Sequence, residues 1–275
     1  MRISWRLLLS GLAVTTALII FIFSVASKEE TFDLDSQILK EVQPVPNNIY
    51  WSDNGGSIVS IPGETVFSET ELAALTPRNV DRSKTGFVNF WYTKEGGAVA
   101  STLGSDLNHH FVQGYLSEYM PFYTDELWVP HYVIAMRKQY TYDEAQYNGF
   151  VEIWQNSMEA YSNARGDCED HSMILCDWLI SLGYEARVAA GTHGRSGHAW
   201  VVLYLDDKAF ILEATKKEHL KHNRHYPLAE LLPEYQPYFM FDQDFYYEPK
   251  SPDSISHRKD QWIKRSILKR NKPLS

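Results

Sequence analysis

RGDCEDHS, residues 165–172, places a cysteine where a helical pattern begins. The residues that follow predict a helix from Cys168 to Leu182, because apolar side chains recur at helical intervals: Ile174, Leu175, Trp178, Leu179 and Leu182. A cysteine in the first turn lies near the positive end of the helix dipole, which lowers the pKa of its thiol. Cys168 is therefore a candidate nucleophile, although a small buried cysteine is the alternative at this position.

Three β-prone runs follow this helix, at Glu185–Thr192, His198–Leu205 and Ala209–Thr215. The glycine-rich HGRSG and the polar DDK separate them as turns. A helix followed by an antiparallel meander predicts an α+β fold, in which the helix packs on the sheet.

Two polar residues on these strands complete a catalytic pattern. His198 starts the second run, where it can reach the start of the helix and act as a base toward the thiol. Glu213 lies in an apolar run, and an acid there needs a partner, because burying an unpaired charge is costly. Orienting His198 is a natural role for it. The alternatives are a surface histidine beside a turn and an edge-strand acid that faces water.

The chain has two cysteines, Cys168 and Cys176, eight residues apart on one predicted helix. At this spacing they lie about 12 Å apart along the helix axis, too far for a disulfide. An exported protein that used cysteine for stability would pair them. The spacing therefore favours a chemical role for one of the two.

Four motifs in order carry a resemblance to the transglutaminase-like superfamily: RGDCEDHS (165–172), GYEARV (183–188), HAWV (198–201) and LEAT (212–215). The match spans roughly Glu126 to Thr215. The resemblance implies a papain-like fold with Cys168 as nucleophile, His198 as base and position 213 as the third member. The family usually has Asp at the third position, and the Glu213 carboxylate lies one methylene further out.

Within that superfamily, the GDCED string is similar to the bacterial transglutaminase-like cysteine proteinases, which are periplasmic and cut surface adhesins. In that family the acids that flank the cysteine bind calcium, which maps here to Asp167 and Glu169. Carboxylate oxygens suit calcium. The alternative, which we expect, is that no cofactor binds and that the two acids stabilise the helix start. Asp170 and His171 are expected to make packing and solvent contacts.

The first 27 residues are expected to form a membrane anchor. No charged residue occurs from Leu7 to Ala26, which is about the 20 residues a helix needs to cross a bilayer. Arg2 and Arg6 precede this stretch, so the rest of the chain is expected on the extracytoplasmic, periplasmic side of the inner membrane. A cleaved signal peptide, ending near Ala26, is the alternative.

The remaining regions are predicted less fully. Residues 28–125 are interpreted as a linker and an uncharacterised region, with a hairpin within 86–103 and a helix at 106–120. The catalytic domain is placed at 126–250, with helices at 125–139 and 143–163 and a surface-packed aromatic stretch beyond 235. Residues 251–275 are expected to form a basic tail, either an interfacial helix or a solvated segment. His219, His222 and His225 could face a metal, but a solvated helix is expected.

The formal net charge is −9, and the basic residues concentrate near the two ends of the chain. The acidic body should repel nucleic acid, which excludes that class of partner. The leading hypothesis is a membrane-anchored thiol hydrolase that cleaves peptide or side-chain amide bonds of a protein or peptide. The alternatives are a protein-glutamine transglutaminase with the same site and a non-catalytic module that binds proteins or cell wall.

Overall fold

The computed structural model describes residues 57–61, 65–68, 71, 88–216, 225–251 and 256–270. The predicted anchor at 1–27, together with His219 and His222, lies outside these residues. Within them, we find no helix with the length and apolar character that a membrane crossing requires.

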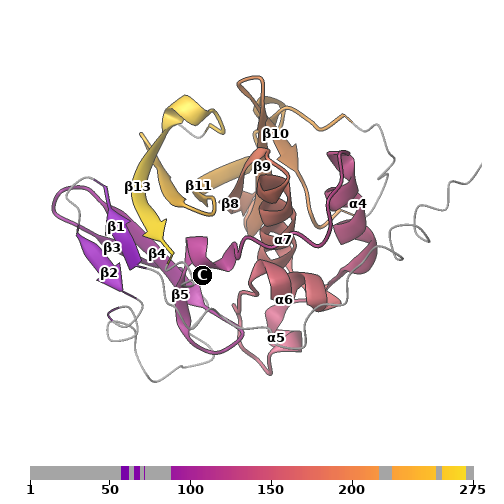
Figure 1. Ribbon diagram of the computed structural model, residues 1–275, viewed down its shortest axis with the longest axis horizontal. Helices are drawn as coiled ribbons and strands as arrows, with labels where there is room; N and C mark the ends of the chain where they lie inside the picture. The colour runs from indigo at the N-terminus through magenta and orange to yellow at the C-terminus, as the bar shows by residue number, and fades with distance from the viewer. Residues whose placement is uncertain are drawn as a thin grey trace, which may run out of the picture. The chain divides into compact units, whose positions relative to one another are not determined.

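The main sheet of the described part of the chain has eight strands in the order β10-β9-β8-β11-β12-β13-β1-β2, and each neighbouring pair is antiparallel (Figure 1). The strands have these bounds: β1 Ser57–Ser60, β2 Val66–Ser68, β8 Glu185–His193, β9 Ser196–Leu205, β10 Lys208–Leu212, β11 Tyr235–Phe241, β12 Phe245–Pro249 and β13 Trp262–Lys269. Strands from both ends of the described chain thus share one sheet with the predicted catalytic meander.

The meander β8–β9–β10 confirms the three predicted strands. Its first turn contains Gly194 with a φ of 64°, and its second turn places Asp206 and Asp207 at φ values of 47° and 61°. Positive φ at two successive residues is the geometry of the tight hairpin turn that matches strand twist. Glu213 follows the end of β10 rather than lying within it.

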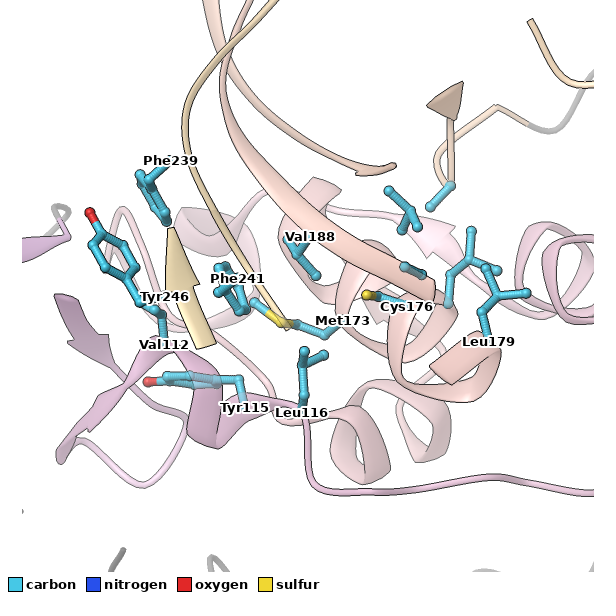
Figure 2. Close-up of a cluster of buried hydrophobic side chains, with 14 of the residues drawn as sticks. Val112, Tyr115, Leu116, Met173, Cys176, Leu179, Val188, Phe239, Phe241 and Tyr246 are labelled. Atoms are coloured by element: carbon cyan, nitrogen blue, oxygen red, sulfur yellow. The ribbon is translucent and has the colours of Figure 1, made fainter. Parts of the chain in front are cut away.

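Helix α7, Cys168–Ser181, confirms the predicted helix and packs on one face of the sheet. Figure 2 shows Met173, Cys176 and Leu179 in the buried cluster with Val188 and Phe241 of the sheet. A second cluster, which includes Trp200, Val202, Tyr235 and Met240, lies on the opposite face, since neighbouring strand residues alternate between faces. The sheet is therefore covered on both sides where it carries the site.

Smaller elements surround this core. A three-stranded antiparallel sheet has the order β3-β4-β5, and β6 pairs in parallel with β7. These and the short helices have the following bounds: β3 Asn89–Tyr92, β4 Ala98–Leu103, β5 His109–Phe111, η1 Val112–Tyr115, α4 Trp128–Arg137, β6 Gln139–Tyr140, α5 Asp143–Gln146, α6 Ser157–Ser162, β7 Arg165–Gly166, η2 Ala229–Leu231 and η3 Lys259–Gln261. The predicted hairpin at 86–103 and the helix at 125–139 correspond to β3–β4 and α4.

Two helix predictions are wrong. Residues 106–120 form β5 and the short η1 rather than one helix, and η1 has buried residues that contact the core. Residues 143–163 form two short helices, because Asn148 and Gly149 both adopt positive φ and so end the helical conformation between them. Asn156 then starts α6 with a capping box to Glu159.

The aromatic stretch and the basic tail also differ from expectation. Tyr235–Phe241 forms β11, an interior strand between β8 and β12, instead of a surface-packed segment. Trp262–Lys269 forms β13 between β12 and β1, instead of a helix or solvated tail. Its apolar and basic residues largely alternate, so that Trp262 and Leu268 are buried while Lys264 and Lys269 are exposed, which is the period of a strand.

Candidate active site

Cys168 is the first residue of α7 and is partly exposed. The backbone N–H of Ala199, the residue after His198 on β9, lies close enough to the thiol to lower its pKa. The thiol also lies 3.3 Å from Oε2 of Glu169 and can donate a hydrogen bond to it. The fold therefore brings the start of α7 against the start of β9, as the motif order predicts.

His198 and Glu213 form a direct pair. Nε2 of His198 lies 2.8 Å from Oε2 of Glu213, and their side chains are only 13% and 10% exposed. The ring nitrogen that faces the carboxylate is Nε2, so Nδ1 is the nitrogen that can exchange a proton with a thiol. This is the pairing of base and orienting acid that a nucleophilic site requires.

The Glu213 carboxylate is held on both oxygens. Oε1 accepts hydrogen bonds from the backbone N–H and the hydroxyl of Thr215, at 3.1 and 2.7 Å. Oε2 accepts one from the Tyr235 hydroxyl at 2.9 Å in addition to the His198 contact. Burial acts to raise the pKa of Glu213, but the hydrogen bonds and charge of His198 and the bonds from Thr215 outweigh it and lower the pKa to about 2. Glu213 is therefore an anion at neutral pH.

The electrostatics of Cys168 are opposite to the expectation of a lowered pKa. Burial, followed by the nearby charge of Asp167, raises the pKa of the thiol to about 12. Glu152 contributes in the same direction. Burial and the carboxylates together thus outweigh the helix dipole at this position, so the thiol needs a base to ionise.

Four carboxylates cluster at the start of α7: Asp143, Asp167, Glu169 and Asp170. Each offers one oxygen such that all four atoms lie within 4.8 Å of one another. Burial raises the pKa of every member, and the charge of Asp167 raises the pKa of the other three further, that of Asp143 to about 9. Buried like charges this close require either protons or a cation.

The residues of the cluster fit a calcium ion. Calcium binds several carboxylate oxygens in irregular geometry. Oδ1 of Asp143 is buried and accepts no hydrogen bond within the described part of the chain. Asp167 and Glu169 were the sequence candidates for calcium, and the structure adds Asp143 and Asp170. The expectation that they only stabilise the helix start does not explain a cluster of four acids.

Asp170 and His171 do not make the solvent contacts expected from the sequence. Both are at most 1% exposed. Asp170 accepts hydrogen bonds from the backbone and the side-chain amide of Gln155, at 2.8 and 2.7 Å. The hydrogen bonds between Asp170 and Gln155 therefore anchor the start of α7 to the segment before α6.

Sequence reasoning missed Asp143, Thr215 and Tyr235. Thr215 belongs to the quoted LEAT motif, and a hydroxyl two residues after an acid is a local signal that could have found it. Asp143 and Tyr235 come from α5 and β11, which fold onto the site from distant parts of the chain. No spacing in the sequence marks them.

A cavity of about 770 Å³ lies elsewhere, beside η2, η3 and the start of β11. Lys208, Leu232 and His257 line it together with Tyr235, whereas Cys168, His198 and Glu213 do not. We therefore do not assign bond cleavage to this cavity.

Residues 152–244, which contain Cys168, His198 and Glu213, match the protein family described as the CEP76 peptidase-like domain. The match covers the part of the chain from before α6 to the turn after β11, which is less than half of the chain.

Individual proteins resemble the chain over limited lengths. The centrosomal protein of 76 kDa from Xenopus tropicalis is 40% identical over 55 residues, which are 20% of this chain and 8% of that protein. The chain thus spans a small part of this relative. Among solved structures, EGTA-treated LapG of Legionella pneumophila gives a TM-score of 0.39 at 17% identity, over 54% of this chain and 79% of LapG. Calcium-bound LapG gives 0.37 at 19% identity, over 55% and 83%.

Proposed function

We propose that this protein is a cysteine peptidase or amidase of transglutaminase-like fold that uses Cys168, His198 and Glu213. The observation that carries the proposal is the buried 2.8 Å contact between His198 and Glu213. Cys168, at the start of α7, lies near this pair, since the backbone N–H of Ala199, the residue after His198, lowers the pKa of its thiol. The match of residues 152–244 to a peptidase-like domain supports the same class of activity.

The geometry supports general-base activation of the thiol. Burial and nearby carboxylates raise the pKa of Cys168 when the acidic cluster holds no cation, so a base is needed to take the thiol proton as the nucleophile attacks. Nδ1 of His198 takes the thiol proton while Sγ bonds to the carbonyl carbon of the substrate. The anionic Glu213 stabilises the imidazolium that forms. Backbone N–H groups at the start of α7 are suited to bind the oxyanion.

The second half of the reaction returns the site to its starting state. The imidazolium gives its proton to the leaving nitrogen as the C–N bond breaks, which leaves a thioester on Cys168. Water then attacks the thioester and transfers a proton to Nδ1 of His198. The C–S bond breaks, the carboxylic acid is released, and the imidazolium returns its proton to the thiolate.

We also propose that Asp143, Asp167, Glu169 and Asp170 hold calcium in the working protein. When bound, the cation would supply positive charge next to the nucleophile. Neutralising Asp167 removes the largest of the nearby negative charges that, together with burial, raise the thiol pKa. The rest of the site, Glu213 and His198, does not depend on this cluster for its hydrogen bonds.

The cellular location that we propose is the one expected from the sequence. We propose that Leu7–Ala26 anchors the chain in an inner membrane and that the site faces the periplasm, where protein or peptide substrates reach it. Fractionation of cells that express the full-length chain, followed by external protease treatment of spheroplasts, tests this. Protection of residues 88–270 in intact spheroplasts would contradict it.

Thiol reactivity is the first test of the chemistry. Iodoacetamide alkylation is followed by mass spectrometry at neutral pH in the full-length protein, with Cys176, which is fully buried, as the internal reference. We expect Cys168 to react faster than Cys176, and His198→Ala to slow it. His225→Ala is the control, because His225 is an exposed histidine that is not part of the proposed site. Equal slowing in both variants would count against a specific base.

Bond cleavage is tested with a proteome-derived peptide mixture, in which mass spectrometry detects new C-termini. Hydrolysis that Cys168→Ala abolishes supports the proposal. Addition of cadaverine separates the alternatives, since amide bonds to cadaverine in place of new carboxylates identify a transglutaminase. If iodoacetamide does not alkylate Cys168 and no cleavage or cadaverine product forms, the protein is a non-catalytic binding module.

A further inference from the structure

Tyr235 contacts the catalytic acid from outside the meander that carries the site. It is the first residue of β11, which pairs with β8 so that Tyr235 lies opposite His193. Its side chain is buried, and its hydroxyl donates a hydrogen bond to Oε2 of Glu213 at 2.9 Å. This is the same oxygen that Nε2 of His198 contacts at 2.8 Å. One carboxylate oxygen thus joins the histidine and the tyrosine.

The tyrosine ring is fixed by its neighbours. It stacks on the His193 ring with centroids 4.3 Å apart and an interplanar angle of 23°. The Trp200 ring meets it edge-on at 5.2 Å and 73°. Burial, followed by the charge of Glu213, raises the pKa of Tyr235, so that the hydroxyl keeps its proton and acts as a permanent donor.

A glutamate needs more restraint than an aspartate in this role. Its extra methylene adds a rotatable bond, and each unrestrained rotamer lowers the fraction of time for which the carboxylate faces the histidine. Thr215 holds Oε1 through two hydrogen bonds, but neither of them restrains Oε2. Besides His198 itself, the donor to Oε2 within the described part of the chain is Tyr235.

We propose that Tyr235 is a positioning residue, whose hydroxyl holds Oε2 of Glu213 against Nε2 of His198. The inference rests on the proposed Cys-His-Glu chemistry and adds the residue that adapts it to the longer acid. Asp167 and His193 also lie near His198, but Tyr235 is the neighbour that shares its acceptor oxygen.

The test compares Tyr235→Phe with Tyr247→Phe. Both tyrosines are buried and both donate to a carboxylate, but Tyr247 bonds to Asp242 at 2.6 Å, away from the site. The first readout is the downfield proton NMR signal of the His198 ring N–H, which a tight hydrogen bond to Glu213 protects from exchange with water. We expect this signal to broaden or vanish in Tyr235→Phe and to persist in Tyr247→Phe. An unchanged signal in Tyr235→Phe overturns the proposal.

The second readout is the rate of Cys168 alkylation by iodoacetamide. Tyr235→Phe removes a hydrogen bond to a charged carboxylate. The free energy of such a bond corresponds to at least about a tenfold change, so we expect alkylation to be slowed about tenfold. Tyr247→Phe should react as the wild type does. Glu213→Asp draws the carboxylate away from Tyr235, so adding Tyr235→Phe to it should cause no further loss. Fully additive effects contradict a shared role.

The two readouts separate the inference from the proposed function. If His198→Ala leaves the alkylation rate of Cys168 unchanged, the proposed chemistry fails. The NMR signal still decides whether Tyr235 fixes the His198–Glu213 pair. If His198→Ala slows alkylation and both tyrosine variants behave like the wild type, the chemistry stands and the positioning role is wrong.

Discussion

Glu213 is a buried anion whose charge is stabilised by its partners, and this links stability to pH. Its folded pKa of about 2 lies below the ordinary value of 4.5. A lowered folded pKa contributes stability that is fully present above the unfolded pKa and is lost as the pH falls toward the folded one. The window in which this contribution disappears therefore runs from about pH 4.5 down to about pH 2.

The matching prediction uses Glu213→Gln, which keeps the shape and removes the charge. We expect the variant to be less stable than the wild type at pH 6 by up to about 3 kcal/mol, the free energy that corresponds to the pKa shift. Urea unfolding at pH 6 and pH 3 measures the difference, which should narrow at the lower pH. A gap that stays constant between the two would show that the charge of Glu213 contributes nothing.

Cys168, His198 and Glu213 could be predicted from sequence because each lies at a readable position. The cysteine opens an apolar helical pattern, the histidine follows a glycine-rich turn, and the glutamate interrupts an apolar run. The environment of the thiol could not be predicted, because Asp143 and Glu152 reach the start of α7 only through tertiary folding. Their assignment as a working triad stays a prediction until the thiol is tested.

At the scale of elements, the approach of β8 to β11 positions Tyr235. A Cβ built on Gly191 would meet the backbone oxygen of Gln236 at 2.0 Å and Cα of Pro237 at 2.8 Å. Neither neighbour is a flexible side-chain end, so Gly191→Ala must displace the start of β11. We expect a destabilisation of about 1–3 kcal/mol in urea unfolding, together with slower alkylation of Cys168.

Gly197→Ala is the control for this change. Gly197 lies on the neighbouring strand β9, and a Cβ there meets no atom within 4 Å. The control should leave both stability and alkylation near wild type. Equal effects of the two substitutions would show that a general loss of strand glycine, and not the β8–β11 contact, is responsible.

The acidic start of α7 predicts a response to calcium. We expect calcium at about 100 times its Kd to raise the Tm by roughly 5–10 °C, because binding to the folded state alone stabilises it. Asp143→Asn should reduce this rise. Asp177→Asn is the matched control, since Asp177 is a buried acid of α7 outside the cluster, bonded to Tyr119 and Gln243. A Tm that calcium leaves unchanged in the wild type would remove the proposal of a metal site.

Elements with a strong local period were predictable and the others were not. The helix at 168–181 and the meander β8–β10 have clear apolar spacing. The stretch at 106–120 has apolar residues that suit a helix, but its partners in β4 and the core impose β5 and η1. Likewise, Trp262–Lys269 is basic enough for a surface, and its place inside the sheet depends on β1 and β12.

At the scale of the whole molecule, β13 joins two parts of the sheet. It pairs with β12 on one side and with β1 on the other. Deletion of residues 262–275 would leave both of these neighbours with open hydrogen-bonding edges, which favour association between molecules. We expect the truncated protein to aggregate in size-exclusion chromatography and to lose cooperative unfolding. Deletion of residues 271–275 alone is the control, and similar behaviour of the two would contradict a central role for β13.

The pairing of β1 with β13 also constrains how the protein is made. Ser57 pairs with Lys269, so this ladder cannot be complete until residue 269 has left the ribosome. Until then the early strands have no partner on that side, and contacts of such long sequence separation form slowly. In the nascent chain, β1 therefore lacks its β13 partner until the last described strand has emerged. Chaperone demand during synthesis should fall abruptly once residue 269 is free.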